Sequence, residues 1–542
     1  MALLQSGAFF LIFAAFNAAQ SLAGVIPGPP NIASYQFAAL YGTYTLLCIP
    51  APKIVDWLGP KLSMVLGAVP YTLLVVSFLF PGYCHGGVVD HCWSEGTVTA
   101  VKLTAGALVG VGAPLLWTGQ GIYLARAAAW SVQLGGGAET ATSGTSLLGS
   151  IGLKERVGEA NKEFNGLFFT LFQASGATGL CVSSLILTLV KGTEALPVLF
   201  IALASCCGCG IVALVCLLPA LKAVPKDADD TEDKAEVTLF QTLELFFTDS
   251  RMYLLVPNVI YNGMSLGFIW FTYNAYVWGT GLGASFVGFG SAAFYLVNAA
   301  CTQLTKIMAK KHGQMSVMTL ATACHALFFL FFMFYDVDPA LCDPEICAGT
   351  HHLSMNGTKP LPLYSCFKKG PPVNSSTTLT SLPCHGGTGP SCDTCEVFTA
   401  HTRNGGDRAQ ACGDGYAQCE WLHGNVLPPK AMAVVIFFAG AFVFALGDSV
   451  WEGQVPAILQ TLFDSKSGKQ ESAMANLKLF QSLGITITFV IAANMDDIKK
   501  ESLILLCTLV VSSLALVLAH FKVANLDTGK LRSEVGMYDD LA

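Results

Sequence analysis

Two acidic residues lie inside a long apolar stretch, where charged side chains are rare. Asp448 and Glu452 fall within residues 431–460, and their i, i+4 spacing places both on one helical face beside Trp451 and Gln454. An acidic side chain at the centre of a membrane helix costs roughly 2.5–3.5 kcal/mol, and two like charges repel each other. We therefore expect the pair to hold a proton or a cation. The alternative is that both lie near the cytoplasmic membrane surface and bond to loop groups.

A second set of polar side chains lies inside other apolar stretches. Polar groups at membrane depth usually face the interior of a helix bundle, so these residues are candidates to line a central substrate or ion cavity. They could equally form hydrogen bonds between helices, worth about 0.6 kcal/mol each. The two tryptophans of the set either line this cavity or only pack against their neighbours. The set is Asn17, Gln20, Trp117, Gln120, Asn165, Gln173, Asn262, Trp451, Gln454 and Gln481.

The sequence contains no catalytic signature. It has no phosphate-binding glycine loop, no His-Glu-x-x-His motif and no nucleophile elbow between a strand and a helix. The net charge of −7 arises largely in loops and at the C-terminus, whereas nucleic-acid binding calls for a basic stripe. We expect neither an enzyme nor a nucleic-acid-binding protein, and we expect no cofactor.

The elements that position these residues are predicted to be membrane helices. Of the 542 residues, 53% are hydrophobic and 12% are charged, about half the charged fraction of an ordinary soluble domain. The mean hydropathy is +0.56, and apolar segments of roughly 20 residues recur along the chain. We predict an all-α polytopic protein in the lipid bilayer, with about twelve spans near 5–24, 31–52, 62–81, 102–125, 163–190, 196–220, 252–277, 283–305, 315–335, 431–460, 473–493 and 501–522.

The first apolar stretch is expected to be a span rather than a cleaved signal peptide. No Lys or Arg precedes it, so it lacks the charged start of a secretory signal. The alternative is cleavage near Asn17–Gln20, where small residues offer a site.

Three glycines on the predicted helices have an expected structural role: Gly106, Gly110 and Gly112 are expected to allow close helix contact.

Basic residues in the short loops predict the orientation of the chain. In membrane proteins, Lys and Arg are enriched on the cytoplasmic side. With twelve spans, the basic residues of the short loops all fall on one face of the membrane, together with both termini. That face is therefore predicted to be cytoplasmic. The basic residues are Lys53, Lys61, Arg126, Lys154, Arg156, Lys162, Lys222, Lys226, Lys306, Lys310, Lys311, Lys466 and Lys469.

The opposite face carries a short loop at 82–101 and a long, cysteine-rich loop at 336–429. The long loop holds two glycosylation sequons, at Asn356 and Asn374, which make sense only in the secretory lumen or outside the cell. In that compartment we expect a disulfide-stapled outer domain, although Cys392-x-x-Cys395 and nearby histidines leave a metal site open. The candidate disulfide cysteines are Cys84, Cys92, Cys342, Cys347, Cys366, Cys384, Cys392, Cys395, Cys412 and Cys419.

Weak internal repeats predict two related halves. We expect an N-terminal six-helix half at 1–221, a cytoplasmic linker at 222–250 and a C-terminal half at 251–542, which contains the outer loop and a cytoplasmic tail at 524–542. The halves share Trp117-Thr118-Gly119-Gln120 with Trp451-Glu452-Gly453-Gln454, Leu171-Phe172-Gln173 with Leu479-Phe480-Gln481, and Asn17 before Ser21-Leu22 with Asn262 before Ser265-Leu266.

Two short motifs resemble known signals. Asp56-Trp57-Leu58-Gly59-Pro60-Lys61 resembles the D-x-x-G-x-K/R signature of the major facilitator superfamily, although Pro52 stands where that signature usually has Gly. The resemblance implies that Asp56, Gly59 and Lys61 act at a cytoplasmic gate. The tail residues Tyr538-Asp539-Asp540-Leu541 resemble a tyrosine-based sorting signal read by clathrin adaptors, which relies on Tyr538 and Leu541.

Within that superfamily, most of the predicted spans resemble the Unc-ninety-three-like, ion-channel-regulatory branch, whereas the long outer loop and the glycine-rich insert at 135–152 do not. The resemblance implies the major facilitator fold and a protein that regulates or traffics a channel or receptor. The residues that carry it are Gln20-Ser21-Leu22, Gly112-Ala113-Pro114-Leu115-Leu116-Trp117 with Gln120 and Tyr123, Asn165 to Phe169, Phe172 to Gly176, Gly447 to Trp451 with Gln454, Ala473 to Asn476, and Phe480-Gln481.

Two functions therefore remain open. The first is a regulatory or trafficking membrane protein that binds a channel or receptor in the plasma membrane or an endosomal or lysosomal membrane. The second is a secondary-active transporter of a small solute or ion, coupled to protons or cations through Asp448 and Glu452. The sequence names neither the solute nor the partner.

Overall fold

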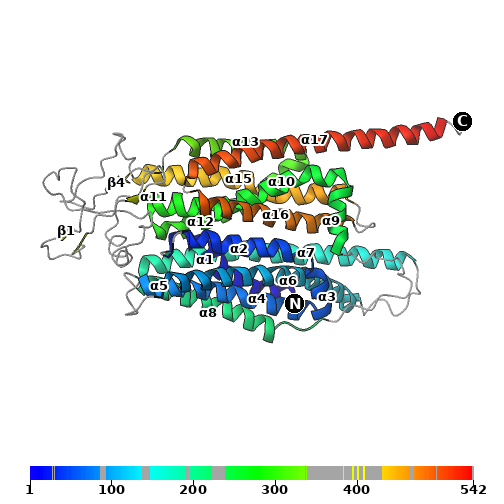
Figure 1. Cartoon of the computed structure of the whole chain (residues 1–542). Helices are drawn as coiled ribbons and strands as arrows, with labels where there is room; N and C mark the ends of the chain where they lie inside the picture. Colours follow the sequence, from blue (N-terminus) through cyan, green and yellow to red (C-terminus); the bar gives the residue numbers. More distant parts are fainter. Residues whose placement is uncertain are drawn as a thin grey trace.

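The computed structural model describes residues 1–26, 28–29, 31–85, 93–136, 147–190, 194–221, 239–335, 337, 382–383, 394–395, 400–401, 407–408, 430–463, 469–495 and 497–539. These residues form a bundle of long helices, with short strand pairs at one end (Figure 1). The predicted all-helical polytopic membrane protein is confirmed.

The first group of helices is formed by the N-terminal part of the chain. Figure 1 shows these helices, in blue and cyan, lying together on one side of the bundle. They are α1 (Ala2–Leu22), the 3-10 turn η1 (Ala23–Val25), α2 (Ile32–Leu47), α3 (Ala51–Leu58), α4 (Pro60–Ser77), α5 (Leu79–His85), α6 (Glu95–Gly136), α7 (Leu147–Leu189) and α8 (Ala195–Cys216).

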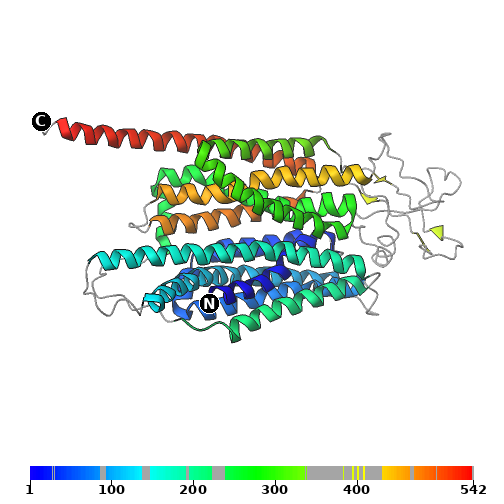
Figure 2. The same ribbon diagram turned by 180° about the vertical axis from the view of Figure 1, so that it is seen from behind.

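The second group follows in sequence and lies on the other side of the bundle, as the view from behind also shows (Figure 2). After α10 the chain widens into two π-helical segments, η3 and η4. The group comprises α9 (Leu239–Thr248), α10 (Ser250–Gly267), η3 (Phe268–Thr272), η4 (Asn274–Gly279), α11 (Thr280–Leu282), α12 (Ala284–His312), α13 (Gln314–Phe334), α15 (Lys430–Leu462), α16 (Lys469–Asn494) and α17 (Ile498–Asp539).

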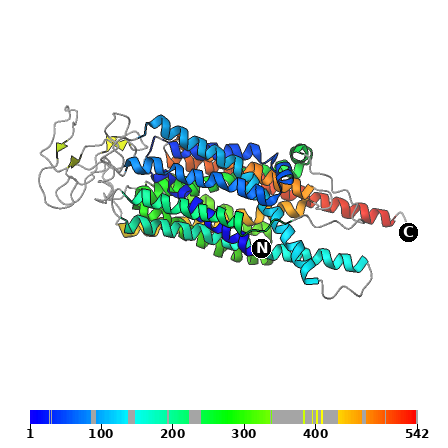
Figure 3. The same ribbon diagram turned by 90° about the horizontal axis from the view of Figure 1, so that it is seen from below.

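The described strands are two residues long. β1 (Leu382–Pro383) pairs antiparallel with β2 (Thr394–Cys395), and β3 (Ala400–His401) pairs antiparallel with β4 (Asp407–Arg408). Figure 3 shows that the C-terminal end of α17 and the first turns of α7 extend from the opposite end of the bundle. Several predicted sites lie outside the described residues: Cys92, Cys342, Cys347, Cys366, Cys384, Cys392, Cys412, Cys419, Asn356, Asn374 and Leu541.

Glycines let the helices of each group approach closely. A Cβ atom added at Gly106 or Gly110 of α6 would collide with a backbone carbonyl of α2, and one at Gly112 would collide with the Gly67 carbonyl of α4. The predicted role of these three glycines is confirmed. Gly263 of α10 and Gly484 of α16 make the equivalent contact in the second group, where each faces a carbonyl of the other helix.

The two groups meet mainly along two helix pairs, α7 with α12 and α2 with α16, and α1 also contacts α12. Between α2 and α16, the Thr45 hydroxyl donates to the Ser482 hydroxyl over 2.9 Å, and Phe37 stacks on Phe489 with 5.3 Å between ring centroids. Polar and aromatic contacts therefore join helices that are far apart in the sequence.

Among the described residues, eleven helices are long and apolar enough to cross a membrane. The expected span at 31–52 is not among these eleven helices, because α2 is only 16 residues long and ends at Leu47. A three-residue turn, Cys48–Pro50, separates it from α3. Proline disfavours helical geometry in the residue before it, which accounts for a break at this point.

Parts of the expected linker and tail are helical. α9 lies within the linker expected at 222–250, and α17 continues through most of the tail expected at 524–542. The candidate span within α17 is Ile498–Phe521, and the helix itself continues to Asp539. The hydropathy of the sequence marked the end of the span but not the end of the helix.

Candidate functional site

The fully buried carboxyl group of Asp448 lies in the interior of the second helix group. It projects from α15, and the Asn298 side chain of α12 donates a hydrogen bond from Nδ2 to Asp448 Oδ2 over 2.6 Å. Asn298 is also buried, with 5% of its surface exposed. The amide holds one carboxyl oxygen in place and leaves the other free to interact.

A hydrogen-bonded histidine lies against Gly447, the residue before Asp448. Tyr261 of α10 and His325 of α13 are both fully buried, and the Tyr261 hydroxyl lies 2.6 Å from His325 Nδ1. His325 Nε2 lies 3.2 Å from the Phe444 carbonyl oxygen, which can only accept a hydrogen bond. Nε2 therefore donates, and Nδ1 accepts from the tyrosine.

Packing fixes the orientation of this histidine ring. His325 stacks on Phe444 with centroids 4.4 Å apart and an interplanar angle of 15°. A Cβ atom at Gly447 would collide with the imidazole, so a glycine is needed at this point of α15. The imidazole ring is therefore held against α15 at the residue before Asp448. Trp451, on the same helix, packs edge-on against Tyr261 with 5.0 Å between ring centroids.

We call Asp448, Asn298, Tyr261, His325 and Trp451 the carboxyl cluster. Two of its buried polar atoms, Asp448 Oδ1 and Trp451 Nε1, have no hydrogen-bond partner among the described residues. A buried polar atom without a partner costs about 1–3 kcal/mol. An acceptor and a donor one helical turn apart, in apolar surroundings, can bind a proton, a small cation or a hydrogen-bonding solute.

A second polar group extends from the carboxyl cluster. Glu452 lies one turn after Asp448 and is near enough to interact with it and with Lys478 of α16 electrostatically. The Lys478 ammonium group donates to Gln481 Oε1 over 3.2 Å, and Gln481 Nε2 donates to Asn262 Oδ1 of α10 over 2.6 Å. Lys478 is exposed and Glu452 is half-buried, so this group connects the buried carboxyl to an accessible surface.

The structure therefore brings together five of the residues predicted to line a cavity: Asn262, Asp448, Trp451, Glu452 and Gln481. Gln454, on the same helix as Asp448, is buried with 9% of its surface exposed.

The predicted polar residues of the first helix group are dispersed instead. Gln20 Nε2 donates to the Tyr41 hydroxyl over 3.1 Å, and the Gln120 backbone carbonyl accepts from Gln5. Asn165 donates to the carbonyl of Asn161, one turn earlier in its own helix. Gln173 is half-buried on α7.

Two other residues of this group have mainly packing neighbours. Trp117 lies in an aromatic cluster, 5.1 Å from Phe13 and 5.2 Å from Phe172 between ring centroids. Asn17 is buried next to Gly176 of α7, where an added Cβ would lie 3.2 Å from its Nδ2.

Sequence reasoning missed His325, Tyr261, Asn298 and Lys478. Two of them carried the strongest signal, because His325 and Lys478 are ionisable residues within predicted spans 315–335 and 473–493. Such residues in a span are candidates for function in their own right. Asn298 carried the same signal as Asn262, because it is a polar amide within the predicted span 283–305, whereas Tyr261 carried none.

The predicted gate motif joins α3 to α4. Gly59 is the turn residue, with φ of 80°, a conformation that favours glycine. Asp56 is exposed on α3, and the Lys61 ammonium group donates to the Val215 carbonyl near the end of α8 over 2.8 Å. Lys61 thus ties the start of α4 to the end of a neighbouring helix.

The described residues contain no group of three or more His, Cys, Asp or Glu side chains that could hold a metal ion.

Comparison with known proteins gives a family match and several relatives. A family model described as ion channel regulatory protein UNC-93 matches residues 31–339. Human protein unc-93 homolog A is 24% identical over 363 residues, which cover 60% of this chain and 70% of the relative. The putative potassium channel regulatory protein unc-93 of Caenorhabditis elegans is 23% identical over 372 residues, covering 62% of this chain and 48% of that protein.

Solved structures with the same architecture are membrane transporters. The nucleoside transporter NupG, as its D323A mutant, aligns with a TM-score of 0.56 and 10% identity, covering 96% of this chain and 99% of that one. A bacterial homologue of the iron transporter ferroportin, in an inward-facing state, aligns with a TM-score of 0.55 and 9% identity over 96% and 97% of the two chains. At these identities the likeness establishes the fold, which is that of major-facilitator-type transporters.

Proposed function

The chain belongs to the UNC-93 family of ion channel regulatory proteins, and on this premise we propose that it regulates an ion channel by binding to it in the same membrane. The observation that carries the proposal is the family match itself, which runs from the start of α2 past the end of α13. The chain is an integral, multi-pass protein of the lipid bilayer.

Removal and replacement of the protein in its native cells tests this regulatory role. Whole-cell currents would be recorded from wild-type cells, from cells that lack the protein, and from those cells after re-expression. Regulation predicts that a defined current changes in amplitude or gating without the protein and is restored by it. Unchanged currents across all ionic conditions, with the protein present in the recorded membrane, would contradict the proposal.

A second candidate function is secondary-active transport coupled to a proton or cation. The observation that favours it is the buried Asp448 carboxyl, whose Oδ1 has no partner among the described residues, in a chain with a transporter fold. In proteoliposomes, Asp448→Asn would abolish flux driven by a proton or cation gradient, while the protein stays folded. Glu163→Gln, at an exposed position on α7, is a matched control that replaces a carboxylate by an amide and would retain flux. Flux that Asp448→Asn leaves unchanged would exclude this mechanism.

We also propose that α2 is the twelfth span and that both termini are cytoplasmic. Support comes from its place between α6 and α16 in the bundle, although 16 residues are few for a span. In this topology the loop at 336–429 faces the lumen or the exterior, with disulfides among its cysteines and glycans on Asn356 and Asn374. The tail then places Tyr538 and Leu541 where an adaptor in the cytoplasm reaches them, at the plasma membrane or on endosomes and lysosomes.

Movement of the two helix groups against each other would give Asp56, Gly59 and Lys61 their proposed gate role. The proposal rests on the resemblance of this motif to the superfamily signature, because the bond from Lys61 to Val215 joins α4 to α8 within the first helix group. Residues 1–221 and 251–542 would then move as separate halves. The remaining cavity candidates, all in the first half, are Asn17, Gln20, Trp117, Gln120, Asn165 and Gln173.

A further inference from the structure

The buried carboxyl group of Asp448 lies near another acid rather than near a base. Glu452, one turn further along α15, is near enough to act on it electrostatically, and a second carboxylate repels a negative charge. The ammonium group of Lys478 acts on Glu452, and Arg251 at the start of α10 pairs with Asp249 over 2.6 Å. Lys478 therefore compensates the charge of Glu452 and leaves a charge on Asp448 uncompensated.

The other titratable groups on the helices around Asp448 supply no positive charge. His325 of α13 is a neutral imidazole, because its Nε2 donates to a backbone carbonyl and its Nδ1 accepts from the Tyr261 hydroxyl. Tyr261 of α10 and Tyr295 of α12 are phenols near enough to Asp448 to interact with it. Cys301 of α12 and Cys324 of α13 are buried thiols. None of these side chains offsets an ionised carboxylate.

The polar atoms around the carboxyl group are mainly hydrogen-bond donors. Asn298 turns Nδ2 towards Asp448 Oδ2, and the buried Nε1 of Trp451 can only donate. The Tyr261 hydroxyl gives its hydrogen to His325. Mg²⁺ and Ca²⁺ take about six or more oxygen ligands, and dehydrated K⁺ is held by rings of carbonyl oxygens. Asp448 Oδ1 is the one buried oxygen of the carboxyl cluster without a partner among the described residues, which suits a proton but not a metal ion.

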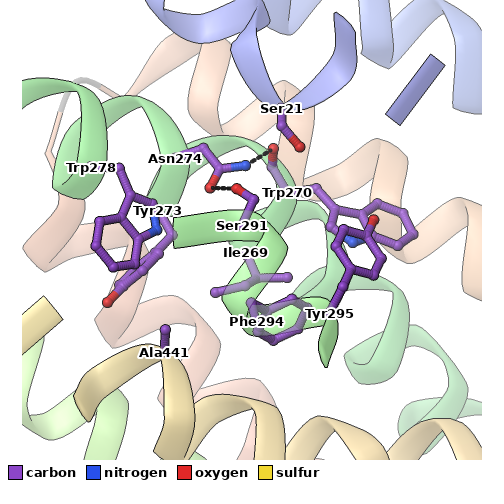
Figure 4. A pocket seen from close by; sticks show the side chains of 10 residues that line it. All are labelled: Ser21, Ile269, Trp270, Tyr273, Asn274, Trp278, Ser291, Phe294, Tyr295 and Ala441. Carbon is purple, nitrogen blue, oxygen red and sulfur yellow. Dashed lines mark hydrogen bonds between the residues drawn. The ribbon is translucent and has the colours of Figure 1, made fainter. Parts of the chain in front are cut away.

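A small cavity on the far side of Tyr295 sets a second limit on the occupant. Ser291 and Asn274 also line this cavity, and Figure 4 shows the hydrogen bond between them. Its volume is about 10 Å³, which is room for about one water molecule. The space next to Tyr295 therefore fits water but no larger solute.

We propose that Asp448 holds a proton on Oδ1 and that this proton, rather than a metal ion or a solute, is the ligand of the carboxyl cluster. Hydronium gives one proton to the carboxylate and leaves as water, so one O–H bond forms and the charge is removed. A neutral acid is far less costly to bury without a partner than a carboxylate. In the second candidate function the proton is then the coupled ion. That last step rests on the second candidate function, whereas the proton site itself does not.

Infrared spectroscopy of the purified full-length protein tests the site, because a protonated carboxyl group has a C=O stretching band that a carboxylate lacks. We expect the nearly isosteric Asp448→Asn to lose such a band from the wild-type spectrum at neutral pH. Glu452→Gln is the matched control on the same helix and should keep the band, because Lys478 compensates Glu452. A folded Asp448→Asn that keeps the wild-type band would overturn the proposal, as would a band that Glu452→Gln removes and Asp448→Asn retains.

The wild-type protein also distinguishes a proton from a metal ion. Its band and its unfolding temperature should be the same in the chlorides of N-methylglucamine, sodium and potassium at equal ionic strength. A band that sodium or potassium removes, together with a higher unfolding temperature, would show that a metal ion competes for Asp448 and would overturn the proposal. These measurements involve no flux, so they separate the two claims. Sodium-driven flux in a protein without the band would leave transport standing and exclude the proton site.

Discussion

At the scale of single residues, the chemistry of this chain is concentrated in one carboxyl group. Asp448 is fully buried, accepts from Asn298 and retains an oxygen without a partner in the described residues. Its position inside an apolar stretch could be read directly from the sequence. The partner on α12 could not, because 150 positions separate the two residues and only the packing of α12 against α15 brings them together.

Loss of the Asn298 amide should destabilise the protein. Asn298→Ala leaves the Asp448 carboxyl without its observed hydrogen bond, and an unsatisfied buried group costs about 1–3 kcal/mol. We expect a lower unfolding temperature in detergent for this variant. Asn494→Ala is the control, since Asn494 is exposed and, among the described residues, its side chain bonds to Val490 of its own helix. Equal unfolding temperatures for the two variants would show that the Asn298 bond contributes nothing.

At the scale of helices, hydropathy predicts the spans but not their irregularities. Most expected spans coincide with helices because a stretch of roughly 20 apolar residues has few alternatives in a bilayer. The break after α2, the π-helical segments η3 and η4, and the continuation of α17 beyond its span depend on local geometry and packing. None of these changes the hydropathy of the sequence.

Close packing between α2 and α6 gives a prediction at this scale. Gly106→Ala would push a methyl group into the Gln36 backbone carbonyl, which cannot rotate away, and overpacking typically costs about 1–3 kcal/mol. We expect this variant to unfold at a lower temperature. Gly121→Ala lies on the same helix with nothing within 4 Å of the added atom, so it should be neutral or slightly stabilising. Indistinguishable variants would contradict the close contact.

At the scale of the whole molecule, the same fold accommodates two kinds of function. Transporters of major-facilitator type share its architecture, whereas the family to which the chain belongs is named for channel regulation. The sequence could predict the family and the bundle because both depend on features spread over many residues. The partner surface depends on contacts with another protein, which no residue pattern in this chain specifies.

The proposed topology predicts glycosylation of the long outer loop. Protein from its native membrane should lose mass on treatment with an N-glycosidase, and the double variant Asn356→Gln, Asn374→Gln should run at the deglycosylated position without treatment. Glycan transfer occurs only on the lumenal side, so the result also fixes the orientation of the loop. An electrophoretic mobility that neither the enzyme nor the double variant changes would contradict this topology.

The most direct test of channel regulation is the composition of the native complex. The tagged protein would be purified from its own membrane in mild detergent, and quantitative mass spectrometry would measure the ratio of every co-purifying multi-span protein. Channel regulation predicts that an ion channel co-purifies at a ratio near one to one. The complex should also remain intact when it is purified a second time by way of the channel. A monodisperse protein with no channel near that ratio would contradict it.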